Sequence, residues 1–171
     1  MQIDIITTLF SVEIGLEDIN IGLLTAFLEN KYDVRSHYYF KPDDETIEVR
    51  VDSDLYIFSV FYNNIEFCDK IIKRIRTHNP SSLILWCGNY VTLYSRELLA
   101  YDVDYILLGD EEFTIENIVN LTKNNESDNI KYLESVLSKQ CNQNKNIARI
   151  DITKLPNANR DCIRKRSIYL Q

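Results

Sequence analysis

Two apolar runs constrain the fold of this chain more than any other feature of its sequence. Residues 54–62, DLYIFSVFY, and residues 82–87, SLILWC, are nearly continuous apolar segments of strand length. Such segments are typical of a parallel sheet, because its strands are buried on both faces. Between them, residues 65–79 carry apolar side chains at helical spacing. This order predicts a parallel strand–helix–strand unit.

The same alternation of strand-like and helix-like segments continues along the chain. We expect strands over residues 2–7, 32–40, 54–62, 82–87 and 103–109, and helices over 19–31, 65–79, 93–102 and 110–123. The predicted fold class is α/β, with a five-stranded parallel doubly wound sheet of flavodoxin-like or Rossmann-like form. Residues 1–123 would form this domain. Residues 124–171 would form a short hairpin and an extended tail.

Composition and charge exclude several classes of function. The 171 residues carry a formal charge of −7, which argues against a nucleic-acid surface. No apolar run reaches membrane-spanning length. The start lacks a basic leader and a cleavage site, so we expect no signal peptide and a cytoplasmic location.

The four cysteines fit no zinc or redox spacing, and the two histidines, His37 and His78, lie far apart, so we expect no metal site built from protein ligands.

Ligands of doubly wound sheets bind where the parallel strands end. The residues after the predicted strands lack the acidic set of a phosphate-accepting receiver, the glycine-rich turn of a dinucleotide fold and any nucleophile–base pair. Asp110, Glu111 and Glu112 are expected to form the acidic first turn of a helix. The remaining residues at the strand ends are small, polar or aromatic: Ser59, Phe61, Tyr62, Gly88, Asn89, Tyr90 and Gly109.

This edge carries little charge and suits a large, flat, mostly apolar ligand with amide-like edges. Taken singly, Phe61, Tyr62 and Tyr90 could equally cap the hydrophobic core. Taken together at one edge, they favour a binding site. Gly88, one of four glycines, follows a buried strand directly and indicates a sharp turn or a close approach of another group.

The order of these segments resembles the N-terminal cobalamin-binding domain of cobalamin-dependent radical S-adenosylmethionine enzymes. DLYIFSVFYNN is similar to that family's buried strand ending in serine. THNPSSLILWCGNYVT is similar to its strand and Gly-Gly-Pro-His-Ala-Thr turn, and VDYILLGDEE to its strand followed by Gly-Glu-Gly-Glu. ARIDITKLPNANRD resembles the segment leading to the radical barrel, and RSIYLQ resembles the strand entry before the cluster loop.

The resemblance implies a cobalamin site at the strand ends, without a catalytic residue in this chain. Ser59 would offer its hydroxyl to the buried nucleotide tail, Phe61 to Asn63 would lie near the lower face of the corrin, and Gly88 would let the corrin or tail approach. The implied cofactor-binding residues are Leu9, Phe10, Ser59, Phe61, Tyr62, Asn63, Cys87, Gly88, Asn89, Tyr90, Gly109 and Glu111.

The sequence departs from the family pattern in several places. Cys87, Asn89 and Glu111 stand where the family has glycine, proline and glycine, and the side chains of Cys87 and Glu111 would narrow the pocket. Neither histidine lies in an Asp-x-His-x-x-Gly pattern, so the corrin would have no histidine ligand. The closely spaced cysteines of a radical iron–sulfur cluster are also missing. The cluster and S-adenosylmethionine would belong to a longer parent protein or to a separate radical domain.

These observations leave two main hypotheses open. In the first, the chain is a cobalamin-binding module, excised from a longer radical enzyme, that presents the corrin to the radical domain in cis or in trans. In the second, it is a natural short protein of the same fold, a degenerate interaction domain that has lost the cofactor. A standalone enzyme is a third possibility with little support in the sequence. No nucleic acid or membrane partner is expected.

Overall fold

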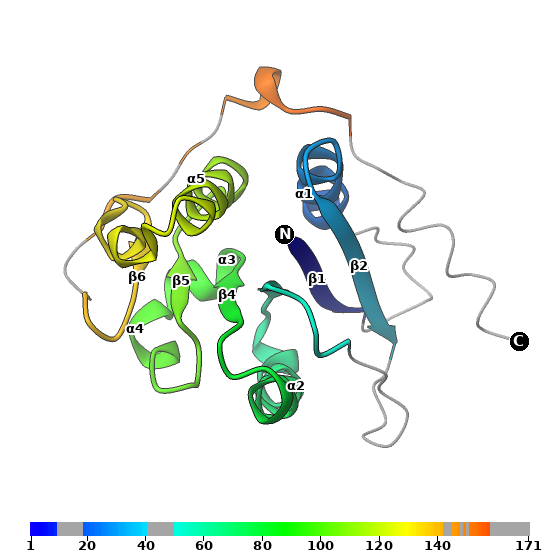
Figure 1. Ribbon diagram of the computed structural model, residues 1–171, viewed down its shortest axis with the longest axis vertical. Coiled ribbons are helices and arrows are strands. Elements are labelled where there is room, and N and C mark those ends of the chain that lie inside the picture. Colours follow the sequence, from blue (N-terminus) through cyan, green and yellow to red (C-terminus); the bar gives the residue numbers. More distant parts are fainter. Residues whose placement is uncertain (10–18, 41–49, 142–144, 148, 150, 158–171) are drawn as a thin grey trace, which may run out of the picture.

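The computed structural model describes residues 1–9, 19–40, 50–141, 145–147, 149 and 151–157. It is an α/β structure, in which helices cover both faces of a mostly parallel sheet (Figure 1). The strands are β1 (Gln2–Leu9), β2 (Asp33–Phe40), β3 (Leu55–Ser59), β4 (Leu83–Cys87), β5 (Tyr105–Leu107) and β6 (Val136–Leu137). The sequence predicted five strands, whereas the described residues form six.

The strand order is β2-β1-β3-β4-β5-β6. The first five strands pair in parallel, and β6 pairs antiparallel with β5. The chain moves outward from β1 to β2 on one side and then from β3 through β5 on the other, so the order reverses between β1 and β3. Such a reversal is where doubly wound sheets usually hold ligands, outside the carboxyl ends of the strands. We call this edge, where β1, β3, β4 and β5 end, the carboxyl edge.

Two helix layers follow from the period-two alternation of side chains along the strands. One face of the sheet packs against α1 (Ile19–Glu29) and α5 (Glu112–Lys123), and we call it the α1/α5 face. The other face packs against α2 (Ile65–His78), α3 (Asn89–Leu93) and α4 (Ser95–Leu98). Apolar strand residues therefore line both faces, as the two continuous apolar runs predicted.

Several elements end where local geometry interrupts them. The run 54–62 forms a strand only to Ser59, because the 3-10 helix η1 (Tyr62–Asn64) turns the chain into α2. The helix predicted over 93–102 begins earlier, directly after Gly88, and is divided into α3 and α4. Both differences arise from turns that apolar periodicity does not encode.

The chain after α5 returns to the same sheet. The 3-10 helix η2 (Ser127–Tyr132) leads to β6, and Ser138 and Cys141 form an antiparallel bridge that closes a tight turn. The sheet therefore includes residues beyond 123, where the sequence placed the end of the domain. A third 3-10 helix, η3 (Ile152–Lys154), follows in the tail. Among the described residues, no helix has both the length and the apolar character to cross a membrane.

Candidate functional site

The ends of β3 and β4 place the central residues of the predicted site side by side. Ser59 and Cys87 are the last residues of their strands and pair directly across the sheet. The backbone N–H of Val60 donates to the carbonyl of Cys87 at 3.0 Å, which extends the pairing by one residue. Gly88 and Gly109 follow β4 and β5 at the same edge. The strand-end residues that the sequence selected therefore do converge.

Asn64 organises this edge, and sequence analysis did not select it. Its Nδ2 donates to Oγ1 of Thr8 at 3.0 Å and to the carbonyl of Ser59 at 3.0 Å. Its Oδ1 accepts from the N–H of Phe61 at 2.7 Å. One fully buried side chain thus joins the ends of β1 and β3 to the start of η1. The only signal in the sequence was a second asparagine beside Asn63 after a strand.

Gly88 has a backbone conformation that favours glycine. Its φ is +113°, a conformation that side-chain-bearing residues rarely adopt. A Cβ at this position would lie 3.4 Å from the carbonyl oxygen of Val60, so the group that approaches it closely is the neighbouring strand. The carbonyl of Gly88 accepts from the N–H and hydroxyl of Thr92, and Thr92 Oγ1 accepts from the N–H of Gly109 at 3.0 Å. Thr92 thus links the two glycine turns.

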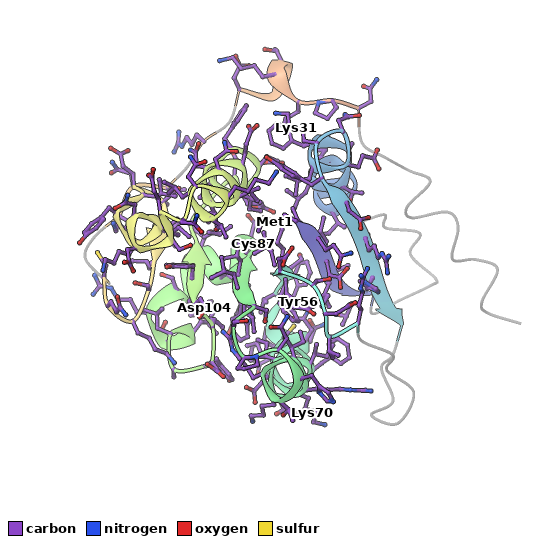
Figure 2. The ribbon with its side chains drawn as sticks, viewed as in Figure 1. Met1, Lys31, Tyr56, Lys70, Cys87 and Asp104 are labelled. Atoms are coloured by element: carbon purple, nitrogen blue, oxygen red, sulfur yellow. The ribbon has the colours of Figure 1, made fainter. Side chains whose placement is uncertain are left out.

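Ser59 and Cys87 project onto the α1/α5 face. Cys87 belongs to the core cluster of that face, and Ser59 follows Leu55 and Ile57 of the same cluster at period two. The thiol of Cys87 is fully buried in the middle of the molecule and donates to the carbonyl of Phe58 at 3.4 Å (Figure 2). The hydroxyl of Ser59 makes no hydrogen bond to the described residues, although the residue is 5% exposed. The Ser59 hydroxyl at the carboxyl edge is therefore available to hydrogen-bond a ligand.

Aromatic side chains form an exposed rim beside this edge. Tyr62 is 78% exposed and Phe61 38% exposed. The rings of Tyr62 and Tyr90 lie 6.0 Å apart edge to face, and those of Tyr90 and Tyr94 lie 4.7 Å apart. Burial, followed by the neighbouring Tyr94, raises the pKa of Tyr90, so its phenol stays neutral at physiological pH. We call Phe61, Tyr62, Tyr90 and Tyr94 the aromatic rim.

The remaining predicted site residues lie around the same loops. Asn63 is exposed in η1, and Asn89 is the exposed first residue of α3. Glu111 is half-buried before α5. Leu9 is the last residue of β1. Phe10 lies outside the described residues.

Glu112 lies in the first turn of α5, as the sequence predicted. The residue is only 6% exposed, which the sequence did not indicate. Burial, with the charge of Asp110 as a further cause, raises the pKa of Glu112. No hydrogen-bond donor among the described residues contacts its Oε2. Burial is set by packing from other elements, so the acidic triplet alone did not distinguish this residue from its neighbours.

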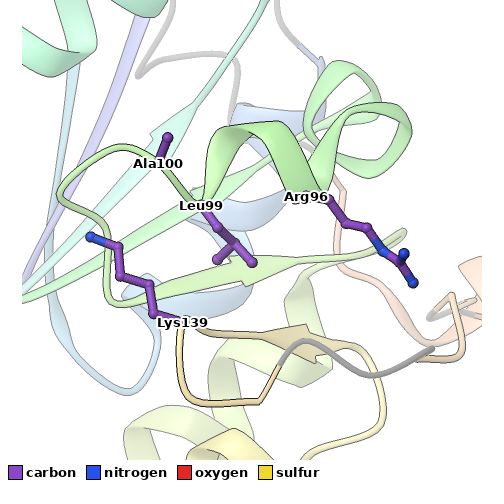
Figure 3. A pocket seen from close by; sticks show the side chains of 4 residues that line it. All are labelled: Arg96, Leu99, Ala100 and Lys139. Atoms are coloured by element: carbon purple, nitrogen blue, oxygen red, sulfur yellow. The ribbon is translucent and has the colours of Figure 1, made fainter.

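A pocket of about 530 Å³ lies away from the predicted site. Arg96 and Leu99 from the region of α4, Ala100, and Lys139 from the turn after β6 line it (Figure 3). The side chains of Arg96 and Lys139 extend in opposite directions on either side of Leu99 (Figure 3). A second pocket, of about 230 Å³, also includes Lys139. None of the residues predicted at the carboxyl edge lines either pocket.

Metal-ligating side chains do not gather in the described part of the chain. No group of three or more His, Cys, Asp or Glu residues there is placed to hold a metal ion. His37 lies within β2 and His78 ends α2, as predicted, and Nε2 of His37 is 3.3 Å from Oδ1 of Asp4. Burial raises the pKa of Cys68, so its thiol stays protonated in the core under α2.

No protein-family model matches this chain, and a comparison with curated proteins found no match.

Proposed function

We propose that this chain is a cobalamin-binding module that holds the corrin over the carboxyl edge of its sheet. The observation that carries the proposal is the combination of an unengaged Ser59 hydroxyl with an exposed aromatic rim at one sheet edge. A doubly wound sheet binds its ligands at this edge. The order of sequence motifs that resembles the cobalamin-binding family supports the same ligand.

The residues present fit such a ligand in part. Phe61 and Tyr62 offer apolar area for a flat macrocycle, and Ser59 offers a hydroxyl near the strand ends. At Gly88 an added Cβ would make ordinary van der Waals contact with the backbone of Val60, so the positive φ is what favours glycine there. The fit therefore depends on the rim and the α1/α5 face rather than on the glycine turn.

In this proposal the chain supplies binding and orientation. The aromatic rim excludes water from one side of the macrocycle, and Ser59 hydrogen-bonds the buried part of the ligand. Bound cobalamin would supply methyl transfer or another radical step. A radical S-adenosylmethionine domain, in cis or in trans, would carry the iron–sulfur cluster, and we expect the complex in the cytoplasm.

One observation favours a second candidate function. Cys87 is fully buried against the carbonyl of Phe58, at the position where the resemblance calls for glycine. A side chain that fills this position is consistent with a degenerate pocket. The exposed tyrosines of the rim would then contact a partner protein, and the chain would be a non-catalytic interaction domain.

A titration with hydroxocobalamin, followed by its visible spectrum, tests the first proposal. We expect saturable binding with the spectrum of a corrin that lacks a histidine ligand. Tyr62→Ala should weaken binding by about three- to tenfold, because one aromatic contact contributes about 0.5–1.5 kcal/mol. Gly88→Trp is unsuitable for this test, since its positive φ would strain any side chain there.

Tyr132→Ala is the matched control. Tyr132 is also a tyrosine in a 3-10 helix and is 68% exposed, but it lies in η2, near β6. Its replacement should leave the affinity unchanged. Equal affinities for Tyr62→Ala and Tyr132→Ala would contradict the placement of the site. A chain that shows no saturable binding would favour the degenerate interaction domain.

A further inference from the structure

Glu112 is a buried residue whose carboxyl group accepts from its own backbone N–H but keeps one oxygen without a donor among the described residues. It is 6% exposed, and its Oε2 contacts no hydrogen-bond donor among the described residues. Donors close to it in sequence are already engaged. The N–H of Gly109 donates to Thr92, and the hydroxyl of Thr114 is paired with that of Ser135 at 2.9 Å. Oε2 is therefore an acceptor without a donor among the described residues.

The helix places this acceptor at the proposed site. Ile115 and Val119 follow Glu112 by three and seven residues, so the three side chains share one side of α5. Ile115 and Val119 pack in the core cluster of the α1/α5 face together with Cys87. Glu112 lies one turn nearer the start of the helix, which follows directly from the end of β5. This position is the carboxyl edge of the α1/α5 face, the face onto which Ser59 projects.

An unsatisfied buried polar group destabilises a fold unless something else satisfies it. The first turn of a helix does not require burial of its acidic side chain, because an exposed carboxylate interacts with the helix dipole equally well. The burial of Glu112 therefore calls for a partner that is brought by a ligand.

We propose that Glu112 anchors the ligand by accepting a hydrogen bond at Oε2 from an uncharged N–H donor, such as a primary amide. The inference rests on the proposed function, because cobalamin carries primary amides around its corrin. An anionic group at the same place would be repelled when the carboxyl group is ionised and would offer no donor. Burial raises the pKa of Glu112, and its protonated form can additionally donate to the amide carbonyl.

The test compares cobalamin with its isomeric monocarboxylates, in each of which one side-chain amide is replaced by a carboxylate. We expect the wild-type chain to bind one isomer about tenfold or more weakly than cobalamin, while the other isomers bind nearly as well as cobalamin. Glu112→Leu should weaken the binding of cobalamin itself about tenfold, the effect of one lost hydrogen bond.

Glu112→Gln separates anchoring from a merely structural role. Its amide oxygen still accepts from the ligand amide, so cobalamin should bind within a few-fold of wild type. Its amide N–H can donate to the carboxylate of the discriminated isomer, so the tenfold penalty should disappear. Glu66→Leu is the control, because Glu66 also lies in the first turn of a helix but is exposed. Fluorescence of Trp86, the single tryptophan and fully buried, verifies that each variant is folded.

The possible failures are distinguishable. If wild type binds cobalamin and Glu112→Leu binds it equally well, the anchoring role is overturned while the cobalamin module stands. If all monocarboxylates bind wild type alike, the role is also overturned. If wild type does not bind cobalamin, the proposed function and this inference are both overturned.

Discussion

Two buried carboxyl groups lie on opposite faces of the sheet, and their surroundings differ. Asp4, on the α2 side of β1, is fully buried, and its Oδ2 accepts from the hydroxyl of Ser53 at 2.9 Å. Its Oδ1 is 3.3 Å from Nε2 of His37. Glu112, on the α1/α5 face at the carboxyl edge, is nearly as buried, but its Oε2 contacts no donor among the described residues.

The surroundings of Asp4 extend into a network. The hydroxyl of Tyr56 accepts from the N–H of Ser53 and donates to the carbonyl of Arg50, both at 3.0 Å. Tyr56 lies between the sheet and α2 (Figure 2), in the core cluster of that face. A carboxylate held in this way is a structural element of the fold. Oδ1 of Asp4 also lacks a hydrogen bond, but the imidazole of His37 lies beside it. Oε2 of Glu112 has no donor among the described residues, and a buried polar atom of this kind can be satisfied by a ligand.

The largest expected effect comes from removing the carboxylate to which the Ser53 hydroxyl donates. Asp4→Leu should lower the free energy of unfolding by about 3 kcal/mol, because it leaves the buried Ser53 hydroxyl without its acceptor and removes the contact between Oδ1 and Nε2 of His37. Urea unfolding followed by far-ultraviolet circular dichroism measures the loss. Asp4→Asn keeps an acceptor for Ser53 and should cost less. A loss below about 1 kcal/mol for Asp4→Leu would contradict the structural role.

Removing the buried side-chain amide of Asn64 at the carboxyl edge should have the next largest effect on stability. Asn64→Ala removes the hydrogen bonds to Thr8, Ser59 and Phe61. It should cost about 2 kcal/mol, since the two fully buried bonds, to Thr8 and Ser59, contribute about 1 kcal/mol each. Asn63→Ala, the exposed neighbour in η1, serves as the control and should change stability by less than about 0.5 kcal/mol. Thermal or urea unfolding of the two variants gives the comparison. Equal effects would mean that Asn64 does not organise the edge.

Glu112→Leu should act in the opposite direction from Asp4→Leu. In the absence of ligand it replaces an unsatisfied carboxyl group with an apolar side chain, so the free energy of unfolding should rise by about 1 kcal/mol. The same urea experiment measures the gain. A loss of stability comparable to that of Asp4→Leu would show that Glu112 is a structural group and would remove the contrast between the two carboxyls.

The smallest expected effect is a pH dependence. Because burial raises the pKa of Glu112 above its ordinary value of 4.5, the folded chain binds this proton more tightly than the unfolded chain. This proton therefore contributes to the free energy of unfolding of wild type relative to Glu112→Gln. The contribution should be fully present below pH 4.5 and be lost as the pH rises through the raised pKa. Unfolding of both proteins across a pH series measures this difference. A difference that grows with rising pH would have the wrong sign.

The sequence predicted the parallel core well, because strands that are buried on both faces appear in the sequence as continuous apolar runs. The runs 54–62 and 82–87 form β3 and β4, and the helical spacing of residues 65–79 forms α2. The antiparallel strand β6 was missed because Val136 and Leu137 are only two apolar residues within a polar segment. Its pairing depends on the exposed edge of β5, which is distant in sequence.

Prediction of the candidate site was less complete. The predicted site residues that follow β3 and β4 do lie at one edge, because the carboxyl ends of parallel strands meet there. The role of Gly88 as an opening for a ligand stays a prediction, and the structure shows the positive φ of Gly88 and the carbonyl of Val60 beside it. Asn64 was overlooked and Glu112 was assigned to the first turn of a helix, since the burial of each, and the donors and acceptors that other segments bring to it, are not encoded locally.

The sequence by itself determined the α/β class, the parallel strands and the edge at which polar and aromatic residues collect, because these follow from local periodicity and from where apolar runs end. Only the tertiary structure decided which polar groups are satisfied. Asp4 lies between two isoleucines and Glu112 ends an acidic triplet, and neither context indicates how the carboxyl group is bonded. The side chains that surround each come from other strands and helices, and hydrogen-bond satisfaction depends on these distant contacts.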